Sequence, residues 1–246
     1  MLASLACGAS NAQPPAKGQG PQGPGQRPTQ TPQAASAVDL TGDWVSVVTG
    51  DWKFRMVTPN KGVIEGLPLN AEGKRIADTW DPKQDTANGE QCRSYGAGNI
   101  MRVPGRLRIK WESSDTLRID TDAGTQTRLL KFGAPEKPGE PSWQGSTHAE
   151  WHKPVGPAAA GTGGSLKAVT TGLKPGYLRK NGAPYSDATV LTEYFERQSA
   201  PNGDSWLIVT QIVKDPKYLS RPYITSANFK KIPEGQGWNP TPCSAN

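Results

Sequence analysis

One carboxylate lies within a run of apolar residues, an arrangement that can support proton transfer. In the segment 191–197, strand alternation places Glu193 on the same side as Leu191 and Phe195. Burial raises the pKa of a carboxylate that lacks a cationic partner, and such a group can act as a general base. The alternative interpretation is a structural ion pair between Glu193 and Arg128 or Arg197. The sequence leaves both interpretations open.

An enzyme of this kind would be a cofactor-independent isomerase, hydratase or lyase with Glu193 as its base. Arg128 or Tyr194 would stabilise the negative charge that develops on the substrate. On a regular strand Tyr194 points away from Glu193, so Arg128 is the better partner.

A second group of candidates lies in the long connection from Gly172 to Asp187. Tyr177 and Tyr185 flank a basic stretch that contains Arg179. Two phenols and two cations could form a rim for an anionic or aromatic ligand at the mouth of a barrel. The alternative is a well-anchored surface loop.

Both histidines of the chain lie close together, in His148-Ala149-Glu150-Trp151-His152. On a strand, His148, Glu150 and His152 would form a row with neighbours about 6.5–7 Å apart. Adjacent ligands could share a metal ion only if the strand bends. A solvated edge explains the row equally well, and we predict neither a metal nor a cofactor.

The cysteines indicate an exported protein. The first twelve residues resemble the end of a secretory signal peptide, whose removal would take Cys7 with it. Lipid attachment at Cys7 is the alternative. The remaining pair, Cys92 and Cys243, predicts a disulfide in an oxidising compartment, either the periplasm or the cell exterior. A catalytic thiol at Cys92 would require a nearby histidine.

The composition predicts an all-β domain that positions these residues. The chain has 246 residues with 28 Gly and 23 Pro, which disfavours a helical bundle. About ten runs with period-two alternation predict strands, and short turns between several of them predict antiparallel pairing. They cover residues 41–49, 52–58, 106–112, 116–121, 125–132, 148–152, 165–171, 189–197, 206–213 and 223–230. One helix is expected after Asn70, ending at Asp81-Pro82.

Three regions follow along the chain. Residues 1–12 are the signal remnant, residues 13–37 form a disordered linker rich in Pro, Gln and Gly, and residues 38–246 form the barrel domain. The densest basic group, Arg102 to Lys110, alternates with apolar residues and therefore predicts a solvated sheet face rather than a nucleic-acid surface. No run approaches the roughly 20 apolar residues of a membrane helix.

Two resemblances add to this description. Gly42-Asp43-Trp44 at the start of the first strand resembles the lipocalin and calycin motif. The resemblance implies a lipocalin-like barrel in which Trp44 closes one end against a basic side chain, here Lys230 or Lys231. The chain from Asp39 onward also resembles a family of exported bacterial proteins without an established activity. Its matching segments are 43–45, 69–73, 89–92, 100–106, 191–195 and 215–219.

These observations predict an antiparallel, lipocalin-like β-barrel that binds a small apolar or aromatic molecule inside, as a periplasmic or secreted protein. The expected ligand contacts are Glu193, Arg128, Tyr194, Tyr177, Arg179 and Tyr185. The alternatives are the enzyme based on Glu193 and an envelope structural protein without a ligand.

Overall fold

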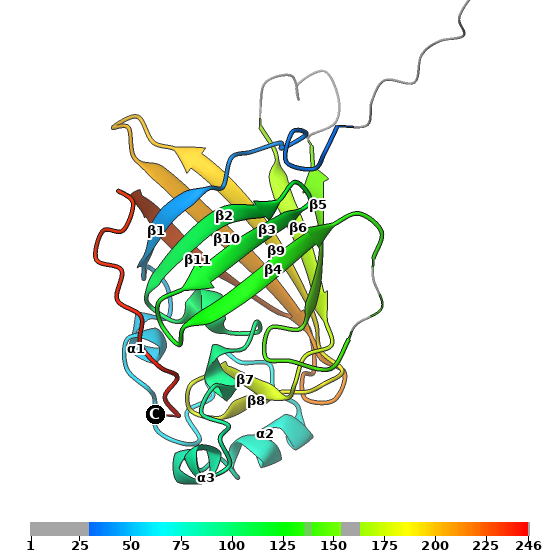
Figure 1. Ribbon diagram of the computed structural model, residues 1–246. Coiled ribbons are helices and arrows are strands. Elements are labelled where there is room, and N and C mark those ends of the chain that lie inside the picture. The colour runs from blue at the N-terminus through cyan, green and yellow to red at the C-terminus, as the bar shows by residue number, and fades with distance from the viewer. Residues whose placement is uncertain (1–29, 136, 138, 154–162, 246) are drawn as a thin grey trace, which may run out of the picture.

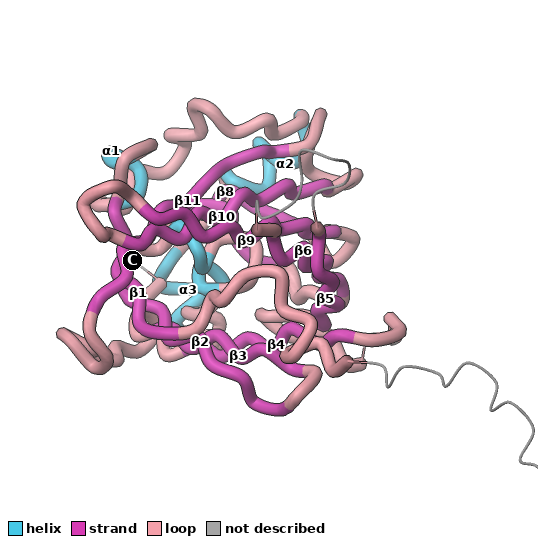
Figure 2. Tube along the Cα trace, turned by 90° about the horizontal axis from the view of Figure 1, so that it is seen from above, coloured by secondary structure: helices cyan, strands magenta, loops and turns pink. Residues whose placement is uncertain are grey.

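A closed β-barrel forms the body of the protein. The computed structural model describes residues 30–135, 137, 139–153 and 163–245. Within them, nine strands close in the order β1-β11-β10-β9-β6-β5-β4-β3-β2. Figure 2 shows the ring of strands end-on. The barrel strands are β1 (Gly42–Val47), β2 (Arg106–Ser113), β3 (Thr116–Thr121), β4 (Gln126–Phe132), β5 (Ser146–His152), β6 (Ser165–Thr171), β9 (Val190–Ser199), β10 (Ser205–Lys214) and β11 (Tyr223–Ile232).

The strands are not all antiparallel, which corrects the expected topology. β4 and β5 run parallel, with Leu130 opposite Thr147 and Phe132 opposite Ala149. The other neighbours in the ring are antiparallel. Parallel neighbours need a crossover connection, and residues 133–145 supply it (Figure 1).

The expected strand over residues 52–58 is wrong, and this reduces the barrel from about ten strands to nine. The segment forms a short helix, α1 (Trp52–Arg55), after Asp51 adopts a left-handed backbone with φ of 53°. Trp52 and Met56 are exposed, so the alternation of apolar residues here does not mark a buried sheet face.

Helices close the lower end of the barrel in Figure 1, together with a small hairpin. The Asn70 side chain accepts a hydrogen bond of 2.8 Å from the Gly73 N–H, which confirms the predicted cap of α2 (Ala71–Ala77). Asp81-Pro82 starts a further helix, α3 (Pro82–Ala87), because proline suits the first helical position. The other elements are η1 (Arg93–Tyr95), η2 (Ile100–Arg102), β7 (Gly176–Arg179) and β8 (Ala183–Tyr185). None of the described helices is long and apolar enough to cross a membrane.

Apolar side chains pack in the barrel interior. Trp44 is fully buried, and its Nε1–H donates to the Leu40 carbonyl at 3.1 Å. The Lys231 ammonium lies 5.5 Å from the centre of the Trp44 ring, whereas Lys230 pairs with Asp204 on the surface at 2.8 Å. The basic neighbour of Trp44 is therefore Lys231.

Part of the predicted linker packs against the upper end of the barrel. The Trp151 Nε1–H donates to the Pro32 carbonyl at 2.8 Å, and the Gln33 N–H donates to the Ser114 carbonyl at 3.1 Å. The packed chain therefore begins several residues before the predicted boundary at residue 38. The predicted signal remnant, Cys7 and residues 13–29 of the linker lie outside the described residues.

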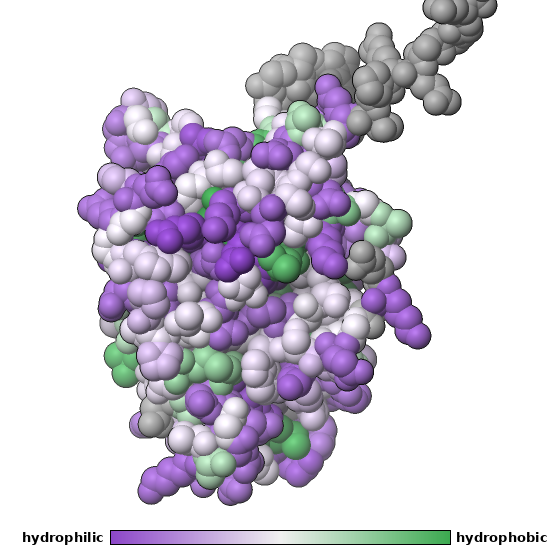
Figure 3. All heavy atoms as spheres, viewed as in Figure 1, coloured by the Kyte–Doolittle hydropathy of each residue, from purple (hydrophilic) through white to green (hydrophobic). Residues whose placement is uncertain are grey.

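Basic residues of β2 and β3 form ion pairs on the outer face of the barrel. Arg108 pairs with Asp43 at 3.0 Å and lies 4.5 Å from the Trp238 ring centre, and Arg118 pairs with Asp120 at 2.9 Å. Figure 3 shows that the face in view is largely polar. The positive charges of Arg108 and Arg118 are therefore paired with carboxylates.

The C-terminal tail is fastened by the predicted disulfide. Cys92 and Cys243 are bonded, with their Cα atoms 5.0 Å apart and a sequence separation of 151. The tail also pairs with the β3–β4 turn, where the Thr241 N–H donates to the Asp122 carbonyl at 2.9 Å. The disulfide joins the C-terminal tail to the helical cap.

Removal of this disulfide should destabilise the domain. We expect Cys92→Ser with Cys243→Ser to lower the free energy of unfolding by about 2–5 kcal/mol, because the unfolded chain loses a long closed loop. Urea denaturation measures the change. Wild-type protein under reducing conditions is the control and should show the same loss. A change below about 1 kcal/mol would show that the tail contacts alone stabilise this end.

Candidate functional site

Glu193 and Arg128 form an ion pair inside the barrel. Glu193 projects inward from β9 and Arg128 from β4, and neither side chain is exposed. The guanidinium donates to both carboxylate oxygens, with Nη1 3.0 Å from Oε1 and Nη2 bonded to Oε2. The Gln211 amide on β10 donates to Oε1 at 3.1 Å. The carboxylate is therefore bonded by groups of the protein itself.

The polar network continues to two threonines. Arg128 Nη2 donates to the Thr170 hydroxyl at 3.4 Å, and Thr170 lies 2.8 Å from the Thr147 hydroxyl. Tyr194 lies outside this network, because it points outward on β9 and its ring centre is 5.9 Å from that of His152. The structure thus brings together two of the three residues proposed for proton transfer.

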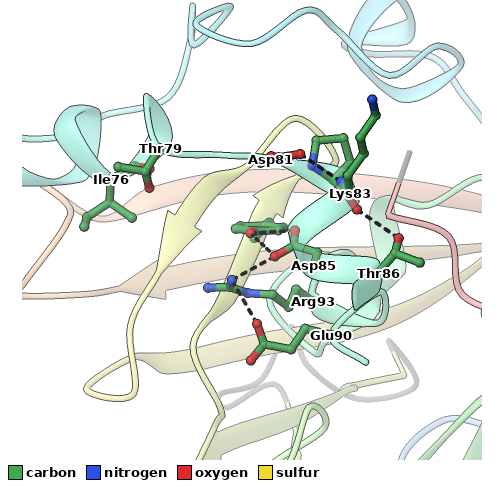
Figure 4. A network of polar contacts seen from close by, with 10 residues as sticks. Ile76, Thr79, Asp81, Lys83, Asp85, Thr86, Glu90 and Arg93 are labelled. Carbon is green, nitrogen blue, oxygen red and sulfur yellow. Dashed lines mark hydrogen bonds and ion pairs between the residues drawn. The ribbon is translucent and has the colours of Figure 1, made fainter. Parts of the chain in front are cut away.

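Tyr177 is buried in the helical cap rather than placed at a barrel rim. Its hydroxyl donates to Asp85 Oδ2 at 2.8 Å, and the Arg93 guanidinium lies 4.5 Å from its ring centre. Figure 4 shows Asp85 beside Arg93, to which it is bonded at 3.0 Å. Burial raises the pKa of the Tyr177 phenol, and its hydrogen bond to Asp85 raises it further. A buried, paired phenol is part of the packing here.

Tyr185 and Arg179 are buried as well, which corrects the expected exposed rim. The β7–β8 hairpin packs against α2 and η1, so its side chains are enclosed. A Cβ at Gly98 would collide with the Tyr185 ring, and a Cβ at Gly96 would collide with its hydroxyl group. Its hydroxyl has no hydrogen-bond partner among the described residues, and burial raises its pKa.

The histidine row lies on the outer face of β5. Glu150, between the two histidines, is bonded to the Lys167 ammonium at 2.7 Å, and this bond lowers the pKa of its carboxyl group. In the part of the chain that the structure describes, no three His, Cys, Asp or Glu side chains are grouped as a metal site would require.

A groove of about 710 Å³ lies along the outer face of the parallel pair of strands. It forms where the 133–145 connection returns from the end of β4 to the start of β5. Outward-facing Leu129 and Val169 line it from the sheet, and Trp143 lines it from the connection. Glu193 and Arg128 do not line the groove.

Gln144 lines the groove, and protein groups bind its amide nitrogen. Its Nε2 donates to the Tyr95 carbonyl at 2.8 Å and to Gln126 Oε1 at 3.0 Å, which fixes the orientation of the amide. Its Oε1 is buried and has no hydrogen-bond partner among the described residues. The sequence patterns did not single out Gln144 as a site residue. The length of the connection was the available signal.

These features define the class of the protein as a small closed β-barrel with a packed interior, an internal ion pair and an external groove. Comparisons with protein families, curated proteins and solved structures find no match to the chain. The resemblances to lipocalins and to exported bacterial proteins therefore stay predictions.

Loss of the Glu193 charge should destabilise the barrel strongly. Glu193→Gln leaves the Arg128 guanidinium buried without a counter-charge, and breaking such a pair costs about 3–5 kcal/mol. Urea denaturation measures the free energy of unfolding.

Glu150→Gln is the matched control, because it removes a carboxylate from a solvent-exposed ion pair with Lys167. We expect a loss of at most about 1 kcal/mol for this variant. Equal losses in the two variants would contradict the stabilising role of the internal pair.

Proposed function

We propose that this protein binds a small, largely apolar or aromatic molecule in the groove beside β4 and β5. The observation that carries this proposal is the groove itself. Its volume of about 710 Å³ falls within the range of about 300–1,000 Å³ of small-molecule sites. Leu129, Phe132, Trp143 and Val169 provide apolar surface, and polar side chains, among them Lys131 and His148, line the rest.

The polar groups suggest a ligand with one hydrogen-bond donor. Gln144 lines the groove, and its Oε1 is shielded from solvent without a partner among the described residues, so a ligand O–H or N–H gains this acceptor when the side chain turns toward the groove. The Trp143 ring suits an aromatic ligand, since aromatic rings associate in offset or edge-to-face arrangements. An aromatic alcohol or amine combines the two features.

The ligand is proposed outside the barrel rather than inside, because side chains occupy the interior positions expected to contact it. Glu193 and Arg128 bond to each other, and Phe195, Val209 and Phe229 are among the fully buried residues of the apolar core. We also propose that the protein acts in the periplasm or outside the cell. The disulfide supports this location, since such bonds persist in oxidising compartments.

The test uses 2-naphthol and 2-methoxynaphthalene, which lacks the O–H donor, in NMR chemical-shift titrations of the full chain. We expect 2-naphthol to shift the resonances of the groove residues saturably and to bind roughly fivefold more tightly. Val169→Trp should weaken binding severalfold, because its larger side chain occupies part of the groove.

Ile224→Trp is the matched control: Ile224 also projects outward from a barrel strand, is 63 % exposed and does not line the groove. It should bind 2-naphthol as the wild type does. Unsaturable shifts, or equal binding by Val169→Trp and the wild type, would contradict the proposal and favour a structural protein without a ligand.

A further inference from the structure

Three arginine side chains meet at the end of the barrel that carries the helical cap. They are Arg55 on α1, Arg102 on η2 and Arg179 on β7, and they are 8 %, 4 % and 5 % exposed. Charged side chains are this deeply buried only when they are paired or bind an ion. Each guanidinium therefore needs a partner.

Backbone carbonyls supply most of the partners. Arg55 Nε donates to the Arg102 carbonyl at 2.8 Å. Arg179 donates to the carbonyls of Val63 and Glu65 at 3.1 and 2.9 Å. Carbonyl oxygens satisfy hydrogen bonds but carry no net charge, so these contacts leave the positive charges of the cluster uncompensated.

Carboxylates near the cluster are fewer than its cations. Asp51 bonds to Arg102 at 2.8 Å, and its own side chain is 46 % exposed. Asp51 and Glu65 are the two carboxylates whose charges act on Arg179. Burial and the neighbouring charge of Arg102 lower the pKa of Arg55 to about 10, which indicates that the cations repel one another. Among the described residues, Arg55 Nη2 is buried without a hydrogen-bond partner.

The three arginines share a small pocket. It is lined by Arg55, Arg102 and Arg179 and walled by Phe54 and Leu178, and its volume is about 20 Å³. Small-molecule sites span hundreds of cubic ångströms, so this pocket is far smaller than they are. The pocket therefore suits a single small group rather than a larger molecule.

We propose that Arg55, Arg102 and Arg179 form a binding site for one inorganic oxoanion of the phosphate or sulfate type. Guanidinium groups bind tetrahedral oxoanions through several N–H donors at once, and the apolar walls strengthen these charge-assisted bonds. The anion supplies the negative charge that the carbonyl partners lack. This site is separate from the groove, so neither proposal depends on the other.

The experiment is isothermal titration calorimetry of the full chain with potassium phosphate and potassium sulfate, against potassium chloride at matched ionic strength. We expect saturable binding of one phosphate or sulfate per chain and none of chloride. NMR spectra of the arginine Nε–H groups locate the site, and the Arg55 signal should shift during the phosphate titration. Absence of saturable phosphate and sulfate binding by the wild type would overturn the proposal.

Arg55→Gln should weaken phosphate binding roughly tenfold or more, because a charge-assisted contact is lost. Arg75→Gln is the control: it also removes one positive charge, but from an exposed ion pair with Glu72 on α2. It should bind phosphate as the wild type does. Equal weakening in the two variants would show general charge attraction and would overturn the site. If Arg55→Gln fails to fold, the wild-type calorimetry and arginine spectra decide.

Discussion

Strand direction alternates around a closed ring of antiparallel neighbours, so such a ring needs an even number of strands. This barrel has nine strands and therefore requires a parallel contact, which β4 and β5 make. Parallel neighbours cannot be joined by a tight turn, and the chain must return along the barrel before the second strand begins. The described residues of this connection, within 133–145, form no helix that could cover the sheet. The external groove lies beside this parallel pair and its connection.

The interior is organised in a different way. Apolar side chains from both halves of the ring form the core, and the charges of the buried Arg128–Glu193 pair compensate each other away from water. The helical cap and residues 30–40 cover the two ends. The two candidate sites, the groove and the arginine pocket, therefore lie outside this core. Because side chains fill the interior, the candidate sites are found at the periphery of the barrel.

Much of the fold could be predicted from local patterns. The alternation over residues 165–171 matches β6, the Asn70 cap starts α2, and the cysteine pair forms the disulfide. Alternation reports burial but not strand direction, so it could not reveal the parallel pair. It also failed at residues 52–58, where the left-handed Asp51 turns the chain into a helix. Tyr177, Arg179 and Gln144 depend on contacts between distant segments, which no local pattern contains.

The most direct test of this account is the direction of β4 against β5 in solution. Backbone NOE measurements on isotope-labelled protein report which residues face each other across the two strands. The account predicts contacts of Leu130 with Thr147 and of Phe132 with Ala149, in the same order along both strands. Contacts of Leu130 with Ala149 and of Phe132 with Thr147, or no contacts between the strands, would contradict the closed nine-strand barrel and the place of its groove beside the parallel pair.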